Sequence, residues 1–470
     1  MLIRNAEIWQ YGLADVRITR RRIAAIGELT PIEGEGALDA RGGALLPGLH
    51  DHHIHMAALA AKRASIMCGP PDVTDEMALA QVLAQPGAGW LRGIGYHESV
   101  AGMLDAAMLD QMAPHRPIRI QHRSGRMWFF NTQAMDSLLV DVAPPPGLNT
   151  KTGRLFDADS WLRETLGSSA PSFVSISTEL AQMGVTGVTD MSPANDPRMA
   201  MHFAQEQNSG NLVQRCLLAG SLSLADGSFT DRLCLGPAKL HLHEAALPNL
   251  AETVHFIDAA HRQGRTIAVH CTTETELVFA LAVFADAKPM RGDRIEHAGI
   301  APDHLIADMV AMGLWAVSQP HFISERGDRY ANDVEQRDLP SLYRLRAFLD
   351  AGVPLAGGSD APFGEPDPWA SMAAAVSRTT RGGIQLGRDE ALTPEEALAL
   401  YLADPVDLTR QRTIDVGTPA DLCLLDRPWD DSRSRLSADH VRLTMIDGKI
   451  VYNRVDQAPV ESCLCVDPLP

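Results

Sequence analysis

The residues best suited to chemistry are four histidines, a lysine and an aspartate that recur at the ends of short apolar runs. The first two histidines lie in the run P-G-L-H-D-H-H-I-H, which spans Pro47 to His55. The complete set is His53, His55, Lys239, His270, His297 and Asp360. Side chains at the carboxyl ends of barrel strands meet at one mouth, where such folds keep their chemistry. The pattern predicts one shared metal site and a metal-dependent hydrolase.

The H-x-H pair is the centre of this prediction. Successive side chains of a strand point to opposite faces, so Asp51, His53 and His55 share a face and the two histidines can bind one cation together. Imidazole suits a borderline metal such as zinc, and a catalytic site keeps one position open for water. An isolated pair is also typical of histidines buried in a core. The two later histidines and the aspartate favour the metal site.

Length, composition and charge limit the class of protein. A chain of 470 residues with 45% hydrophobic content can bury a large core, and it exceeds a single average domain. The formal net charge of -18 disfavours nucleic acid and acidic membrane surfaces as partners. The expected partner is a small-molecule substrate. The oligomeric state stays open, a homo-oligomer included.

Cysteine use and the start of the chain favour the cytoplasm. The 7 cysteines are odd in number and form no C-x-x-C pair, which is typical of reduced thiols. Two of them, Cys463 and Cys465, are expected in a frayed tail. The first residues contain no apolar signal segment, and no apolar run approaches the roughly 18 residues of a membrane span. We therefore expect a cytoplasmic protein that has no membrane partner.

The two ends of the chain are predicted to form one small β-sandwich domain, over 1–45 and 412–460. Apolar and polar residues alternate between turn signals near the start, as in A-D-V-R-I-T. The same pattern returns at 441–452, where Asp447-Gly448 predicts a hairpin turn. Terminal segments with matching strand character commonly pair.

The middle of the chain, 46–411, is predicted to be an α/β domain, a distorted TIM (β/α)8 barrel. Apolar runs alternate there with helical patterns, such as the helix-start signal T-P-E-E at Thr393. Barrel strands are expected at Ala44–Asp51, Val185–Met191, Leu212–Gly220, Ala238–His243, Thr266–Cys271, Arg294–Ala298, Leu314–Gln319 and Pro354–Asp360. The stretch from about 56 to 180 breaks the repeat. It is predicted to be an insertion with strands of its own that helps to shape the substrate pocket.

Taken together, these motifs resemble the amidohydrolase superfamily, and more narrowly its branch of N-substituted formamide deformylases and related long-insert enzymes. The resemblance is carried by P-G-L-H-D-H-H-I-H, Lys239, A-V-H-C at His270, I-E-H-A at His297, G-G-S-D-A-P at Asp360 and the closing A-D-L-C-L-L-D. It implies a distorted TIM barrel with one or two divalent metals at its mouth. It also implies hydrolysis of a C–N bond in an amide or related group.

The resemblance assigns a role to each residue of the set. His53 and His55 match the first-strand ligands, and His270 and His297 match those of the fifth and sixth strands. Lys239 matches a fourth-strand lysine that is often carboxylated and then bridges two metals. The remaining residue, Asp360, matches the eighth-strand aspartate.

The charge of Lys239 leaves two alternatives open. An ammonium group beside a dication is strongly unfavourable, so Lys239 must be neutral, displaced or carbamylated. Carbamylation makes it an anionic bridge between two ions, whereas pairing with Glu244 or Asp190 would belong to a one-metal site. In both cases the metal, expected to be zinc, activates water. Asp360 takes the proton from that water and returns it to the leaving nitrogen.

Departures from the family pattern predict part of the substrate pocket. The segment K-L-H-L-H-E has His243 and Glu244 where relatives usually have an Asp-Gly pair. Its histidines either enter the site or pack inside the barrel. Another candidate, His321, follows the seventh strand. The charged residues at 325–329 are expected to form a solvated or ion-paired loop.

Two more substrate contacts are predicted in the insertion, His122 and Arg126. Both lie in Q-H-R-S-G-R-M-W, and Arg126 stands where relatives often have a histidine. An arginine there could hold a carboxylate or carbonyl oxygen, or form a surface salt bridge.

The predicted function is hydrolysis of an amide-type C–N bond in a small neutral or anionic molecule. The alternative within the same fold is a deaminase that acts on a ring C–N bond with a single metal. A non-catalytic binding protein on the same barrel is a third hypothesis. The complete set of ligands disfavours it, because decay of a catalytic site typically removes ligands or the aspartate.

Overall fold

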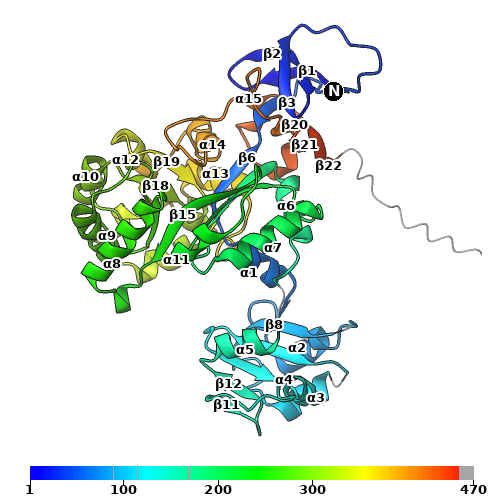
Figure 1. The fold of residues 1–470 in the computed structure, drawn as a ribbon, viewed down its shortest axis with the longest axis vertical. Coiled ribbons are helices and arrows are strands. Elements are labelled where there is room, and N and C mark those ends of the chain that lie inside the picture. The colour runs from blue at the N-terminus through cyan, green and yellow to red at the C-terminus, as the bar shows by residue number, and fades with distance from the viewer. Residues whose placement is uncertain (88, 114, 168–169, 455–470) are drawn as a thin grey trace, which may run out of the picture. The chain divides into compact units, whose positions relative to one another are not determined.

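The computed structural model describes residues 1–87, 89–113, 115–167 and 170–454. The chain divides into two compact units, which are described separately below. One unit joins Met1–Met56 to the chain from Phe173 onward, and the other is Ala57–Ser172. Figure 1 labels the elements along the chain.

The larger unit contains eight parallel strands whose order in the sheet is their order in the chain. They are β6 (Leu49–Ile54), β13 (Val185–Asp190), β14 (Arg215–Gly220), β15 (Leu233–His241), β16 (Ile267–Cys271), β17 (Arg294–His297), β18 (Trp315–Ser318) and β19 (Leu355–Gly357). Every residue of β6, β13, β17, β18 and β19 is buried, as expected for parallel strands covered on both faces. Beyond the end of β19, the amide of Asp360 donates to the carbonyl of His53 at 2.6 Å. The α/β barrel predicted from the sequence is therefore present and nearly closed.

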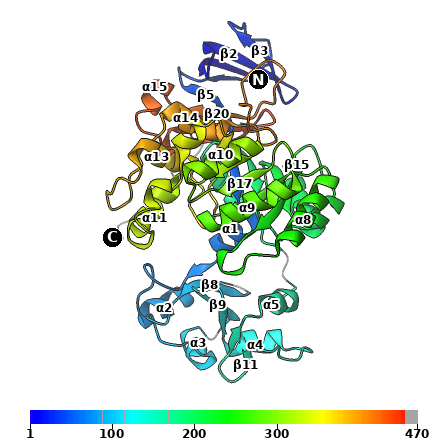
Figure 2. The ribbon, with the colours of Figure 1, turned by 90° about the vertical axis from the view of Figure 1, so that its left-hand side faces the viewer.

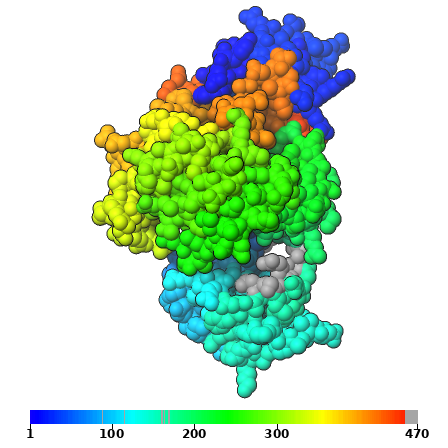
Figure 3. Space-filling view, turned by 60° about the vertical axis from the view of Figure 1, so that its left-hand side comes forward, coloured from blue at the N-terminus to red at the C-terminus, as the bar shows by residue number. Residues whose placement is uncertain are grey.

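Helices connect these strands and cover the outside of the barrel (Figure 2). In the space-filling view, the green and yellow atoms of this part of the chain form its surface (Figure 3). The helices are α6 (Val174–Gln182), α7 (Pro197–Asn208), α8 (Leu250–Arg262), α9 (Glu274–Ala287), α10 (Asp303–Met312), α11 (His321–Asp333), α12 (Leu345–Asp350), α13 (Pro368–Ser377) and α14 (Pro394–Leu402). Short 3-10 helices lie at Leu222–Asp226, Glu244–Ala246, Leu339–Ser341, Arg388–Glu390 and Ala438–His440. The predicted helix start at Thr393 is confirmed, because its side chain and that of Glu396 form a capping box.

Strands from both ends of the chain lie in one further sheet of the same unit. They are β1 (Leu2–Ile8), β2 (Gly12–Thr19), β3 (Arg22–Gly27), β4 (Ala37–Asp39), β5 (Ala44–Pro47), β20 (Leu422–Leu425), β21 (Val441–Ile446) and β22 (Lys449–Asn453). Hydrogen bonding joins them in a single sheet, with β4 paired only to β1. Short α15 (Trp429–Ser432) follows β20. Asp447 and Gly448 have positive φ angles between β21 and β22, so the predicted hairpin turn is present.

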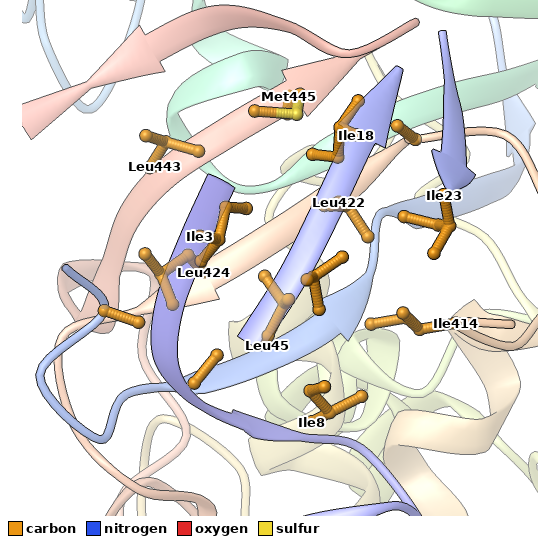
Figure 4. Close-up of a cluster of buried hydrophobic side chains, with 14 residues drawn as sticks. Ile3, Ile8, Ile18, Ile23, Leu45, Ile414, Leu422, Leu424, Leu443 and Met445 are labelled. Carbon is orange, nitrogen blue, oxygen red and sulfur yellow. The ribbon is translucent and has the colours of Figure 1, made fainter. Parts of the chain in front are cut away.

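Apolar side chains of these strands pack in a core of their own (Figure 4). Leu45 of β5 lies among Ile3 and Ile8 of β1 and Leu422 and Leu424 of β20, all of them buried. The first and last parts of the chain therefore stabilise each other. Because β5 runs directly into β6, this packing also fixes where the first barrel strand begins.

The unit Ala57–Ser172 has its own sheet and core. Its strands are β7 (Ile66–Met67), β8 (Leu91–Tyr96), β9 (Ile118–His122), β10 (Met127–Phe130), β11 (Leu148–Asn149) and β12 (Arg154–Phe156). Its helices are α2 (Glu76–Leu83), α3 (Ala106–Met112), α4 (Thr132–Leu138) and α5 (Asp159–Thr165), after α1 (Met56–Arg63) at the boundary. Buried residues such as Leu109, Ile120 and Phe129 pack around the sheet.

Several predicted boundaries are wrong, and the largest error concerns the first barrel strand. The predicted strand Ala44–Asp51 is interrupted at Gly48. A Cβ atom at Gly48 would lie 2.1 Å from Thr186, and the amide of Gly48 donates to the carbonyl of Asp421. The segment before Gly48 is β5 of the terminal sheet, and the barrel strand β6 starts at Leu49. A close approach that only glycine permits separates two strands that read as one apolar run.

Two other expectations also differ from the structure. The eighth strand ends at Gly357, so Asp360 stands in the loop beyond it. The segment at 325–329 is not a loop, because it lies within α11.

Among the described residues no helix is long and apolar enough to cross a bilayer. The five cysteines in this part of the chain are all free, and Cys234 is exposed while the others are buried. Cys463 and Cys465 lie outside the described residues.

Candidate metal centre

Three side chains meet at the carboxyl end of β6 in a group that could hold a metal ion. One ligand atom from each of His53, His55 and Asp360 lies within 4.8 Å of the other two. The distances from Asp360 Oδ1 are 3.3 Å to His53 Nε2 and 3.1 Å to His55 Nε2. The backbone brings them together, since His53 of β6 and His55 just beyond its end are two residues apart and the amide of Asp360 bonds to the carbonyl of His53.

The other three predicted residues come from neighbouring parallel strands. His270 on β16 lies one place before Cys271, which is in register with His297 on β17. The imidazole ring of His297 lies 4.4 Å from that of His270 and 4.8 Å from that of His53, measured between centroids. Lys239 on β15 is in register with Ala268 of β16. Burial lowers the pKa of His270, and the charges of His297 and Lys239 lower it further.

Two atoms of this group are buried without a partner. In the described part of the chain, neither Lys239 Nζ nor His297 Nε2 has a hydrogen-bond partner. Buried polar atoms of this kind are normally satisfied, so these two are where a ligand would be expected. The predicted alternative in which Lys239 pairs with Glu244 or Asp190 is therefore not formed.

Hydrogen bonds on the far side of two of these rings, those of His297 and His53, set the direction of the other ring nitrogen. His297 Nδ1 donates to Gln319 Oε1 at 2.7 Å, which leaves the lone pair on its unpartnered Nε2. The Nδ1 atom of His53 donates to Glu296 Oε2 at 2.5 Å and its Nε2 faces Asp360. Partners of this kind orient metal-binding histidines and strengthen their basicity.

Glu296 is a residue of this group that the sequence analysis missed. It is fully buried between His53 and Arg294, whose Nε lies 2.6 Å from its Oε1. Burial opposes ionisation of this carboxyl, but the charges of Arg294 and Lys239 outweigh burial and hold its pKa below the usual value. The signal was present in I-E-H-A, where a glutamate precedes the histidine inside an apolar strand. A charge there needs a partner, which sequence spacing does not reveal.

The pKa values of Lys239, His297 and Asp360 are all lowered, the first two by burial and the third by hydrogen bonds that outweigh burial. Burial lowers the pKa of Lys239 to about 8 and that of His297 to about 3. For Asp360, burial raises the pKa, but hydrogen bonds from His53 and His55 outweigh it and keep the pKa well below its usual value. The group thus offers a carboxylate, neutral imidazole and an amine that loses its proton readily, which fits a cation.

The backbone is strained at two of these positions. His297 has a φ of 70° and Asp360 a φ of 52°, in the left-handed region that favours glycine. Such conformations persist where the surrounding structure holds them, and they cluster at functional sites.

Asp51 lies beside the group and holds the junction of the barrel. Its Oδ1 accepts from the amides of His53 and Ser359, both at 3.0 Å, and so ties β6 to the segment after β19. Burial raises the pKa of Asp51 to about 6.

The predicted substrate contacts in the barrel unit occupy different environments. His321 is buried, and its two ring nitrogens lie 3.1 Å from Ser371 Oγ and 3.0 Å from the carbonyl of Ser359. The structure therefore uses it to hold the segment after β19. The exposed His243 precedes the 3-10 helix Glu244–Ala246.

His122 and Arg126 lie in the unit Ala57–Ser172. The Nε2 atom of His122 donates to Glu98 Oε2 at 2.9 Å. Arg126 is exposed and forms an ion pair with Asp157, the surface salt bridge that was one of its two alternatives.

The chain matches the family model described as "Amidohydrolase family" over residues 36–452, and it belongs to this family. Over 93% of its length it is 26% identical to the N-substituted formamide deformylase of Arthrobacter pascens, of which the match covers 95%. The resemblance inferred from the motifs is thus confirmed. The protein is an enzyme, a metal-dependent hydrolase of the class that acts on C–N bonds other than peptide bonds.

Solved structures support the fold. An uncharacterized metal-dependent hydrolase from Pyrococcus horikoshii has a TM-score of 0.78 at 19% identity, covering 94% of this chain and 99% of that one. For N-isopropylammelide isopropylaminohydrolase from Burkholderia multivorans the TM-score is 0.55 at 17% identity, with coverage of 96% and 98%. At these identities the likeness extends to the fold alone.

Proposed function

We propose that the protein hydrolyses the amide-type C–N bond of a small molecule at this centre. The observation that carries the proposal is the pair of buried, unpartnered atoms, Lys239 Nζ and His297 Nε2, beside the group of His53, His55 and Asp360. Nitrogen and carboxylate ligands of this kind suit zinc.

The residues that would hold one or two divalent ions are His53, His55, Lys239, His270, His297 and Asp360. Such an ion, when bound, lowers the pKa of water and polarises the carbonyl of the substrate. The histidines would bind in the neutral form, and Gln319 and Glu296 set the ring directions of His297 and His53.

Lys239 is proposed to be carboxylated at Nζ. Burial lowers its pKa to about 8, so its amine loses a proton more readily than that of an exposed lysine, and the neutral amine is the form that adds to carbon dioxide. The product is an anion, which removes the repulsion between an ammonium and a dication. Its oxygens would then be available as ligands for the ions.

Asp360 is the proposed general base and acid. Its low pKa keeps it ionised, and its Oδ1 already accepts from two histidines at the centre. It can take the proton of the attacking water and deliver it to the nitrogen that leaves. The C–N bond breaks as the amine departs, and the acyl part is released as an acid.

Formamides with a substituent on nitrogen are the first substrates to test, because the relative from Arthrobacter pascens is named for them. The test is to load the purified protein with zinc and screen formamides, other N-acyl compounds, carbamates, ureas and cyclic amides for release of amine. Hydrolysis that requires both the metal and Asp360 is the expected result. Release of ammonia from amino-substituted rings, with none from amides, would instead establish a deaminase.

We also propose a domain division. The small β domain comprises 1–45 and 412–460, and the barrel domain comprises 46–411 with an insertion at about 56–180. Two observations support it: one sheet joins β1–β5 to β20–β22, and Ala57–Ser172 is compact by itself.

A further inference from the structure

One large apolar side chain stands in solvent beside the metal centre. Phe363, in the segment after β19, is 62% exposed, and its ring meets that of His55 edge to face at 5.8 Å and 89°. The nearby aromatic residues Phe322 and Tyr343 are buried. An exposed phenyl ring gains little from folding, so its position against a proposed ligand points to a role in binding.

The backbone that carries Phe363 is fixed at several points. Its amide donates to the carbonyl of Asp360 at 2.8 Å, and its carbonyl accepts from Arg326 Nη2. A Cβ atom on Gly364 would lie 2.2 Å from His321 Nε2, so this segment packs closely on α11. Only the phenyl side chain is left free, which makes it a preorganised apolar surface.

Phe363 is also the end of a continuous series of rings that crosses the mouth of the barrel. The centroid separations along this series are 5.8, 5.3, 4.8, 4.4 and 4.3 Å. The rings are Phe363, His55, His53, His297, His270 and His241, in that order. The inner four are proposed metal ligands and the two outer rings belong to exposed residues. A group that reacts over the inner rings therefore has an apolar neighbour on the side of His55.

The positive charge of Arg326, which bonds to the backbone of Phe363, is engaged. The Arg326 guanidinium lies over the ring of Phe322, with its Cζ 3.9 Å from the centroid, and it donates to the carbonyl of Phe363. The guanidinium is therefore held by these two contacts, and the phenyl ring of Phe363 offers hydrocarbon contact beside His55.

We propose that Phe363 binds an apolar substituent of the substrate, so that the preferred substrates are amides with a bulky hydrocarbon group next to the C–N bond. This rests on the proposed function for the position of the reacting group. Such a group, packed against the phenyl face, withdraws apolar surface from water. We expect the removal of this apolar surface from water to make binding about tenfold tighter.

Hydroxamates test this without turnover, because they bind metal centres through their two oxygens. We would measure dissociation constants of the zinc-loaded protein for acetohydroxamate, its N-cyclohexyl derivative and cyclohexanecarbohydroxamate. At least one cyclohexyl compound should bind about tenfold more tightly than acetohydroxamate to the wild type. Phe363→Ala should abolish this gain at unchanged zinc content, and Phe363→Leu should keep most of it. The control is Tyr11→Ala, because Tyr11 is a comparably exposed aromatic residue in the turn between β1 and β2 and its loss should change nothing.

An equal gain from the cyclohexyl group in wild type and Phe363→Ala would overturn the proposal, as would the absence of any gain in the wild type. Measurements of turnover distinguish a failure of this proposal from a failure of the proposed function. For N-cyclohexylformamide, Phe363→Ala should raise KM about tenfold with little change in kcat, whereas N-methylformamide should be unaffected. Hydroxamate binding that depends on Phe363, together with no amide hydrolysis by the wild type, would refute the reaction and leave the apolar subsite standing.

Discussion

The two sides of the barrel mouth differ in how their polar atoms are satisfied. On the side of β6, both histidines bond to Asp360, so the group is complete without a ligand. On the side of β15 to β17, Lys239 Nζ and His297 Nε2 are buried without partners. An unpartnered buried group costs on the order of 1–3 kcal/mol. The comparison suggests that the first side is organised by folding and that the second side depends on a ligand.

The largest effect should follow from removing a ligand of the second side. His270→Ala and His297→Ala should each lose metal and activity together, because each variant removes an imidazole nitrogen that would hold the ion. The protein should remain folded, since the barrel has its own core. Elemental analysis measures the metal content, and circular dichroism measures whether the variant is folded. Full metal content in either variant would contradict the assignment.

Asp360→Asn tests the first side. The amide keeps the shape but cannot accept a proton, so the variant should retain much of its metal and lose on the order of 10²-fold or more in kcat. The acidic limb of the pH–rate profile, where Asp360 becomes protonated, should disappear. Turnover close to wild type would show that proton transfer uses another residue.

Lys239→Ala distinguishes two ions from one. We expect loss of one or both ions and partial recovery of activity with short carboxylates that replace the bridge. Two-metal occupancy of the wild type should also fall when carbon dioxide is removed. The matched control is Lys449→Ala, because Lys449 is an exposed lysine of β22. A bare lysine beside one ion in electron density would favour the one-metal alternative.

Glu296→Gln should have the smallest effect. The neutral side chain still fits between Arg294 and His53 but no longer strengthens the basicity of the imidazole, so metal affinity should fall about tenfold. Competition with a chelator measures it. Glu390→Gln is the control, because Glu390 is also buried against an arginine, Arg344, but outside the centre. Equal affinities in the two variants would remove Glu296 from the proposed site.

Local patterns predicted well wherever the deciding interactions are near in the sequence. The capping box at Thr393 and Glu396 spans one helical turn, and the hairpin at Asp447-Gly448 depends on positive φ angles at two residues. The order of the barrel strands also followed, since parallel strands joined by helices have few alternatives.

Predictions failed where a distant segment decides the conformation. Gly48 ends β5 because Thr186 and Asp421, far along the chain, lie against it. The charged residues at 325–329 were predicted to form a loop but lie in α11. Arg326 of this helix contacts the segment after β19, and the local charge pattern does not predict that contact. Glu296 looked like part of a motif, and its role depends on a histidine from another strand.

The sequence by itself determined the residue types of the site, because strand alternation and the apolar runs place His53, His55, Lys239, His270 and His297 at strand ends. Only the tertiary structure decided which of their atoms are already bonded and which are left without a partner. It also decided that Phe363 is exposed against His55. The physical reason is that spacing fixes the direction of a side chain along its own strand, whereas hydrogen bonding and burial depend on which other strands and loops lie beside it.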